Sequence, residues 1–215
     1  MKPNHWLWAA VAAFFIFRSQ NASASWQPWG MSPAVDATGT AEVLPNMIGE
    51  SDNIDITGDI QLTSHFSNAE FTASKTAAAK GIDNSLPDNL QGNAINTLNM
   101  METIRQYLSN TAGKDIPIFI QSGYRSPALN AAIGGAKNSD HMQAMAVDWI
   151  APEFGTPMEI AQELAPYIDD LGIGQLINEF PGAKGWVHTS TKKPSVAVNR
   201  VITITAQGTV PGIVA

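Results

Sequence analysis

The chain has 215 residues, of which 44% are hydrophobic and 14% are charged. Such a chain can bury a core and lacks the low hydrophobicity and high charge of a disordered protein, so we expect one folded domain with additional segments. The formal net charge of −7 argues against nucleic-acid binding, because gripping phosphates requires an excess of Lys and Arg. Since the chain has no cysteine, disulfides, iron–sulfur clusters and thiol nucleophiles are excluded, and any metal must be bound by His, Asp or Glu.

The N-terminus has the features of an export signal. Lys2 precedes an apolar run over residues 6–17, and Ala22-Ser23-Ala24 has the small-x-small pattern that suits cleavage after Ala24. We therefore predict a signal peptide over residues 1–24 and an exported protein, periplasmic or associated with the cell wall. The alternative is that this segment is retained, either as a membrane anchor through residues 6–17 or as part of a virion-associated protein.

The predicted elements begin after a segment without regular structure. Residues 25–61 are rich in Gly, Pro, Ser, Thr, Asn and Asp and indicate a linker or extended arm. The spacing of Ser67 and Glu70 predicts a capping box that starts a short helix, and Asp88 is expected to cap a long helix over residues 89–110. In that helix, apolar residues recur at three- and four-residue steps and predict one buried face. Its members are Leu90, Ala94, Leu98, Met101, Ile104 and Leu108.

The second half of the chain is richer in predicted strands. The five segments are residues 116–122, 143–150, 173–180, 185–191 and 201–205. Two helices are predicted between these strands, and they start at Ser126 and Thr156, each of which is followed by Pro. Residues 181–184 predict a hairpin turn. Helices come first and strands follow without regular alternation, so we predict an α+β domain over residues 62–206, with helices packed on a small antiparallel sheet, and a tail over residues 207–215.

Three candidate metal ligands, His141, Asp148 and His188, lie in this β-rich half. In an extended strand over residues 143–150, Asp148 shares one face with two apolar residues, and a buried carboxylate there needs a partner. Two imidazoles and one carboxylate are typical of a catalytic zinc site, which leaves a fourth position for water and lowers the pKa of that water to about 7. From these residues alone, a hydrogen-bonded strand histidine and a paired aspartate remain the alternative.

Longer motifs carry a resemblance to a known family. They are Phe66-Ser-Asn-Ala-Glu70, Ser74-Lys-Thr-Ala77, Lys80-Gly-Ile-Asp-Asn84, Ser122-Gly-Tyr-Arg-Ser-Pro-Ala-Leu-Asn130, Gly134-Gly-Ala136, Ser139-x-His141, Ala146-x-Asp148 and Trp186-Val-His188. With these motifs in order, the stretch from Leu62 to His188 resembles the zinc-dependent D-alanyl-D-alanine carboxypeptidases, peptidase family M15, and in particular its compact bacterial and phage-type members. The resemblance implies a zinc ion held by His141, Asp148 and His188, and peptidoglycan peptides as the substrate.

The resemblance also implies roles for three further residues. Glu179, in the strand before His188, matches the general base of the family, and its alternative is a solvated glutamate at a strand end. Arg125 matches an arginine that faces the substrate and can hold a carboxylate or a carbonyl oxygen, and its alternative is a structural ion pair. Ser139 matches a serine that hydrogen-bonds the substrate, and its alternative is a turn residue. Ala144 stands where the family usually has glycine, which matters if the backbone there has a positive φ.

Together these features predict a zinc metallopeptidase that degrades the cell wall. We expect it to cut peptide bonds of peptidoglycan stem peptides, as a D,D-carboxypeptidase or an endopeptidase similar to a phage endolysin. The alternative is a structural or wall-binding virion component that keeps the peptidase fold and uses residues 25–61 and the apolar N-terminal segment to bind assembly partners.

Overall fold

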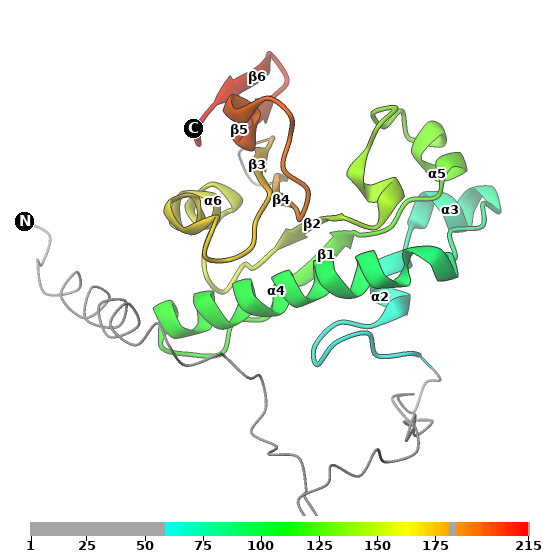
Figure 1. Ribbon diagram of the computed structural model, residues 1–215, viewed down its shortest axis with the longest axis horizontal. Coiled ribbons are helices and arrows are strands. Elements are labelled where there is room, and N and C mark those ends of the chain that lie inside the picture. Colours follow the sequence, from blue (N-terminus) through cyan, green and yellow to red (C-terminus); the bar gives the residue numbers. More distant parts are fainter. Residues whose placement is uncertain (1–58, 181–183, 215) are drawn as a thin grey trace, which may run out of the picture. The chain divides into compact units, whose positions relative to one another are not determined.

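The computed structural model describes residues 59–180 and 184–214. The predicted leader, most of the predicted arm and most of the predicted turn at residues 181–184 lie outside these residues. The predicted α+β class is confirmed, because helices pack on a six-stranded, mostly antiparallel sheet (Figure 1). In the described part of the chain, none of the helices combines the length and the apolar character that are needed to span a membrane.

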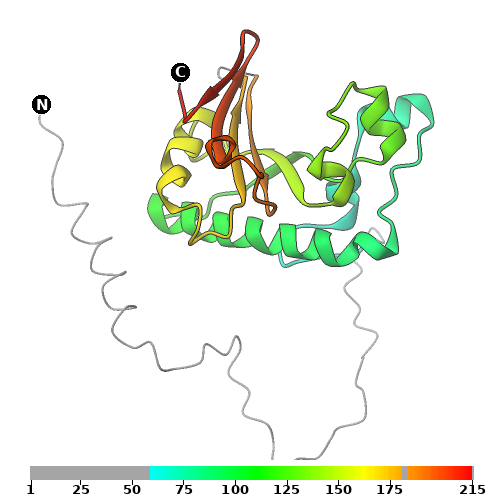
Figure 2. The same ribbon diagram turned by 45° about the horizontal axis from the view of Figure 1, so that its top comes forward.

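The sheet has the strand order β1-β2-β4-β3-β5-β6. The strands are β1 (Phe119–Ser122), β2 (Ala146–Ile150), β3 (Gln175–Glu179), β4 (Trp186–Ser190), β5 (Val201–Thr205) and β6 (Gly208–Pro211). Neighbours are antiparallel except β3 and β5, which run parallel. Where the sequence predicts only a tail, β6 pairs with β5, and this hairpin projects away from α4 (Gln91–Ala112) (Figure 2).

Most helices begin where the sequence places a capping side chain. The other α-helices of the described part are α2 (Asn68–Thr72), α3 (Lys75–Lys80), α5 (Pro127–Ala132) and α6 (Pro157–Leu164), and the 3-10 turns are η1 (Asp88–Leu90), η2 (Asp140–Gln143), η3 (Ala165–Tyr167) and η4 (Ala197–Arg200). Ser67, Ser126 and Thr156 each accept a hydrogen bond from a backbone N–H of the first helical turn.

Two details of the predicted caps are wrong. Asp88 lies inside η1, where its side chain accepts a hydrogen bond from the side chain of Gln91 (3.2 Å) instead of capping α4. The box glutamate of α2, Glu70, turns away from its helix and accepts a hydrogen bond from the N–H of Ile120 in β1 (3.4 Å). The partner of Asp88 is local, three residues away, whereas the partner of Glu70 lies 50 residues away and is not revealed by the local sequence.

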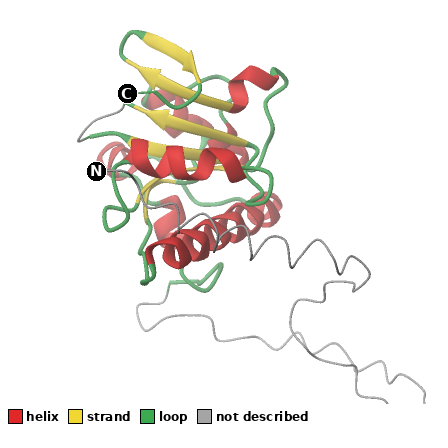
Figure 3. Ribbon diagram, turned by 90° about the vertical axis from the view of Figure 1, so that its left-hand side faces the viewer, coloured by secondary structure: helices red, strands yellow, loops and turns green. Residues whose placement is uncertain are grey.

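The core lies between one face of the sheet and the helices α4 and α6. The apolar face predicted for α4 is confirmed, since Ala94 and the four members that follow it are buried and Leu90 packs at its margin. Trp149 of β2 lies in this core and donates a hydrogen bond from Nε1 to Oγ1 of Thr189 in β4 (3.1 Å). Figure 3 shows the strands side by side, with helices packed against them.

The register of the strands puts a second set of residues on the opposite face. Asp148 of β2 pairs with His188 of β4, and His188 pairs with Ile177 of β3. Side chains alternate along a strand, so these residues point away from the face on which Trp149 packs into the core. We call the side that carries Asp148 and His188 the metal face.

A buried left-handed turn connects η2 to β2. Ala144 has a φ of 54°, which is why the extended strand starts only at Ala146 and not at residue 143 as predicted. Adopting this conformation costs an L-residue other than glycine about 1–2 kcal/mol. The turn is held from α4, because the Thr97 hydroxyl donates a hydrogen bond to the Ala144 carbonyl oxygen (2.9 Å). Residue 144 therefore has the positive φ that suits glycine, the usual residue of the family at this position, and here alanine adopts it.

Replacing Thr97 with valine should lower the free energy of unfolding by about 1–3 kcal/mol, because a side chain of similar shape leaves the buried Ala144 carbonyl without its donor. The matched control is Thr103→Val on the exposed side of the same helix, where the hydroxyl donates only to the Asn99 carbonyl. We expect the control to change stability by less than about 0.5 kcal/mol. Urea denaturation measures both, and equal losses would contradict the role of Thr97.

Candidate metal centre

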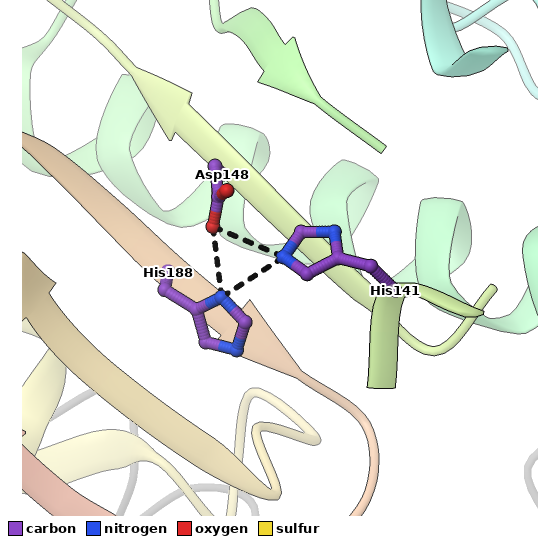
Figure 4. A group of neighbouring side chains, drawn as sticks. All are labelled: His141, Asp148 and His188. Carbon is purple, nitrogen blue, oxygen red and sulfur yellow. Dashed lines mark hydrogen bonds and ion pairs between the residues drawn. The ribbon is translucent and has the colours of Figure 1, made fainter. Parts of the chain in front are cut away.

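The three predicted metal ligands meet on the metal face of the sheet (Figure 4). Nε2 of His141 lies 3.2 Å from Oδ1 of Asp148 and 3.3 Å from Nδ1 of His188. The same carboxylate oxygen lies 2.8 Å from Nδ1 of His188. All three residues are buried, so each ligand atom faces the other two with little access to bulk water.

Different parts of the fold position these ligands. The register of β2 and β4 places Asp148 directly opposite His188. His141 comes from η2, and its Nδ1 lies 2.7 Å from the carbonyl oxygen of Gly123, just after β1. Because a carbonyl can only accept a hydrogen bond, Nδ1 carries the proton and Nε2 presents its lone pair to the other two ligands. A hydrogen bond from the second ring nitrogen is the usual way in which proteins orient a metal-binding histidine.

The donor set fits a tetrahedral divalent metal such as zinc. Zinc binds imidazole nitrogen at about 2.0–2.1 Å, which in a tetrahedron separates neighbouring ligand atoms by about 3.3 Å. The two distances that involve His141 are 3.2 and 3.3 Å and match this spacing, while the distance of 2.8 Å between Asp148 and His188 is shorter because these two groups are hydrogen-bonded to each other. Three protein ligands of this kind leave one coordination position for water or substrate.

Arg125 reaches the site through the aspartate ligand. Its Nη2 donates to Oδ2 of Asp148, and its Nε donates to Oγ of Ser122 at the end of β1 (2.8 Å). The side chain of Arg125 is only 16% exposed. The structure therefore contains the ion pair that the sequence left open as the alternative for Arg125, and it turns Oδ1 of Asp148 toward the two histidines. No role was predicted for Ser122, although it opens the motif that contains Arg125.

The close packing of these groups shifts their titration. Burial alone would raise the pKa of Asp148, but its close contacts with the two histidines outweigh burial and lower the pKa far below its ordinary value. Burial lowers the pKa of His141, which favours the neutral imidazole that a metal requires. Burial has the same tendency at His188, where the hydrogen bond to Asp148 reverses it and raises the pKa.

Glu179 lies on the metal face at the end of β3. Glu179 pairs with Trp186, and Ile177, two residues earlier in β3, pairs with His188. Glu179 and Ile177 therefore point to the same face of the sheet. Burial raises the pKa of Glu179, and the negative charge of Asp148 adds to the rise. The positive charges of His188 and Arg125 offset part of the rise. The indole N–H of Trp186 has no hydrogen-bond partner among the described residues. A partly exposed carboxyl group with a raised pKa on the metal face suits a general base, and this role of Glu179 stays a prediction.

Ser139 occupies the residue before η2, two positions from His141. It is partly exposed, and its hydroxyl makes no capping hydrogen bond to the turn. Ser139 is thus near His141 in the sequence, and its hydroxyl does not hydrogen-bond to the turn. Its contact with a substrate stays a prediction.

Comparison with known proteins agrees with this geometry. The family model described as Peptidase M15 matches residues 64–189, which is more than half of the chain and includes all three candidate ligands. A search of the curated proteins found no match.

Replacing His188 with alanine removes a direct ligand and should weaken the binding of Zn²⁺ strongly. Loss of an outer hydrogen-bond partner weakens metal binding by roughly 10–100-fold, and we expect a larger loss here. His65→Ala is the control, since His65 lies on the surface, where its Nδ1 is 2.6 Å from Oε2 of Glu102, and should leave the affinity unchanged. Competition with a chromophoric chelator measures both. Stoichiometric zinc in the His188→Ala protein would overturn the assignment.

Proposed function

Because the chain belongs to the Peptidase M15 family, a family of zinc metallopeptidases, we propose that it hydrolyses peptide bonds of peptidoglycan stem peptides with a bound zinc ion. Membership makes the chain a metallopeptidase, and the zinc ion and the peptidoglycan substrate are the proposed parts. The observation that carries the proposal is the buried cluster of His141, Asp148 and His188, with Glu179 on the same face of the sheet.

In this proposal, His141, Asp148 and His188 hold the metal. When bound, zinc supplies a Lewis acid that polarises the substrate carbonyl and brings the pKa of a water molecule to about 7. Glu179 accepts the proton of the attacking water on its carboxylate and then donates it to the departing amine. The raised pKa of Glu179 supports both steps, since a carboxyl group is a better proton acceptor and donor when its pKa lies nearer to the working pH.

Arg125 has two parts in the proposed mechanism. Its Nη2 and Nε hold the orientation of Asp148 through the bonds to Asp148 and Ser122. Among the described residues, no hydrogen bond involves its Nη1, and we assign this nitrogen to an oxygen atom of the substrate. Ser139 is the second proposed contact to the substrate. The donor geometry of the guanidinium supports the proposed role of Arg125, because a guanidinium binds carboxylate and carbonyl oxygens directionally.

The proposed location follows from the substrate. Peptidoglycan lies outside the cytoplasm, so we propose an exported protein, with residues 1–24 as its leader. A membrane-anchored or virion-associated protein, similar in use to a phage endolysin, would reach the same substrate. An intact Met1 in protein from the native source, detected by mass spectrometry, would argue for retention of the segment.

Glu179→Gln should keep the zinc content and the fold but slow hydrolysis of a stem peptide by about 10²–10⁴-fold, the usual contribution of a positioned general base. Glu153→Gln is the matched control, because Glu153 is exposed and its one ion pair within the described residues is with Lys114 (3.0 Å), and this variant should hydrolyse the peptide at the wild-type rate. Release of new amino groups, measured with and without a chelator, follows the reaction. Near-normal activity of Glu179→Gln would assign the base to another residue.

If Nη1 of Arg125 binds a terminal carboxylate, the wild-type enzyme should hydrolyse a free-acid stem peptide faster than its C-terminal amide. Charge-assisted hydrogen bonds contribute roughly 1.5–3 kcal/mol, so we expect kcat/KM for the amide to fall by about 10–150-fold. Equal rates would indicate an endopeptidase, in which the arginine binds an internal carbonyl. No hydrolysis of either peptide by the zinc-loaded protein would contradict the proposed function and favour the structural alternative.

A further inference from the structure

Asp140, the residue directly before His141, is bonded to the strand that carries His188. The hydroxyl of Ser190 in β4 donates a hydrogen bond to Oδ2 of Asp140 (3.0 Å), and Nζ of Lys192 lies 2.9 Å from Oδ1. Ser190 also accepts a hydrogen bond from the backbone N–H of Lys192 (3.1 Å). These three side chains join the turn η2 to the end of β4.

The metal site needs such a connection because its ligands are not equally well fixed. Asp148 and His188 face each other across paired strands, so the backbone ladder sets their separation. His141 lies outside the sheet in a four-residue 3-10 turn, a structure with poorer hydrogen-bond geometry than a helix or a ladder. Its distance from His188 therefore depends on what holds η2 in place. The loop after β1 holds His141 itself, because the His141 carbonyl accepts a hydrogen bond from the backbone N–H of Arg125 (3.2 Å) and Nδ1 of His141 donates to the Gly123 carbonyl (2.7 Å).

Side chains hold the two ends of η2. At its C-terminal end, the Asn93 side chain of α4 donates to the Gln143 carbonyl (2.9 Å), and Thr97 donates to the Ala144 carbonyl. At its N-terminal end, Asp140 bonds to Ser190. This second connection runs directly to the strand of a metal ligand, since Ser190 is two residues from His188 on the same face.

We propose that Asp140 is a positioning residue of the metal site, which sets the spacing of His141 and His188 through its hydrogen bond to Ser190. The inference rests on the proposed function, because it assumes that these histidines bind zinc. A metal site requires ligand atoms within about 0.2 Å of their proper distances. Loosening η2 therefore lowers metal affinity even when the domain stays folded.

The two contacts of Asp140 differ in what they contribute. Ser190 is fully buried, and the Asp140 side chain is 17% exposed, so their hydrogen bond is shielded from water. The Lys192 side chain is 53% exposed, and an ion pair of that kind is worth little. The bond to Ser190 should thus carry the positioning, and Lys192 should be dispensable.

Affinity of the full chain for Zn²⁺, measured by chelator competition, tests this. Asp140→Ala and Ser190→Ala should each weaken binding by about 10–100-fold, as the loss of an outer partner does at other metal sites. The double variant should lose no more affinity for Zn²⁺ than the single variant with the larger loss, because both substitutions remove the same bond. Asp140→Asn should stay within about threefold of the wild type, because an amide can hydrogen-bond to a hydroxyl in either orientation.

Two controls separate positioning from a general effect on the fold. Lys192→Met removes the exposed ion pair at the cluster, and Asp169→Asn removes another surface carboxylate, which binds Lys193 (3.3 Å) and Arg200 (2.7 Å). Both should bind Zn²⁺ within about threefold of the wild type. Urea denaturation of the metal-free proteins checks that each variant folds. If Asp140→Ala does not fold, Ser190→Ala and Asp140→Asn still test the role of the bond.

The outcomes separate the inference from the proposed function. Wild-type affinity in both alanine variants, or losses that multiply in the double variant, would overturn the positioning role while leaving the zinc site intact. Failure of the wild-type protein to bind Zn²⁺ would contradict the proposed function, and the inference with it. Loss in the alanine variants together with retention in Asp140→Asn supports the role of the Asp140–Ser190 bond.

Discussion

The pairing of Asp148 with His188 across β2 and β4 places a carboxylate and an imidazole side by side in a buried position. Neither group could be buried alone at low cost, because an isolated charge or unpaired polar group is strongly destabilising away from water. Arg125 completes the balance, since its Nη2 donates to Oδ2 of the same carboxylate, while Nε2 of His141 lies 3.2 Å from Oδ1. The strand register, β1, η2 and the loop that holds Arg125 are therefore all tied to one aspartate.

The two faces of the sheet divide the work of the domain. One face packs on α4 and α6 and provides the apolar burial that stabilises the fold, while the other carries the candidate ligands and Glu179. The helix α4 also acts on the site, because Thr97 holds the carbonyl of the left-handed residue Ala144. A rigid core element thus supports the turn from which His141 projects, as a precise metal site requires.

Membership of the Peptidase M15 family and the geometry of the site support one another, but they answer different questions. The family identifies a metallopeptidase, and the structure shows how this chain arranges the residues that such chemistry needs. Ala144 illustrates the difference. A departure from the usual glycine could have removed the turn, yet alanine adopts the positive φ and the three ligands still converge.

The sequence by itself determined the features that depend on neighbouring residues: the caps of α5 and α6, the apolar face of α4, and the identity of the three ligands through their motifs. The caps and the apolar face follow from local periodicity and local hydrogen bonds, which a few residues encode, whereas the three candidate ligands were identified through motifs that resemble those of a known family. Only the tertiary structure decided which partners distant side chains choose. Arg125 bonds to Asp148, 23 residues away, and Asp140 to Ser190, 50 residues away, because strand register and buried turns bring them together. The pairing of β6 with β5 and the parallel pairing of β3 with β5 likewise depend on how the whole sheet assembles, since no turn signal recognised in the sequence specified these neighbours.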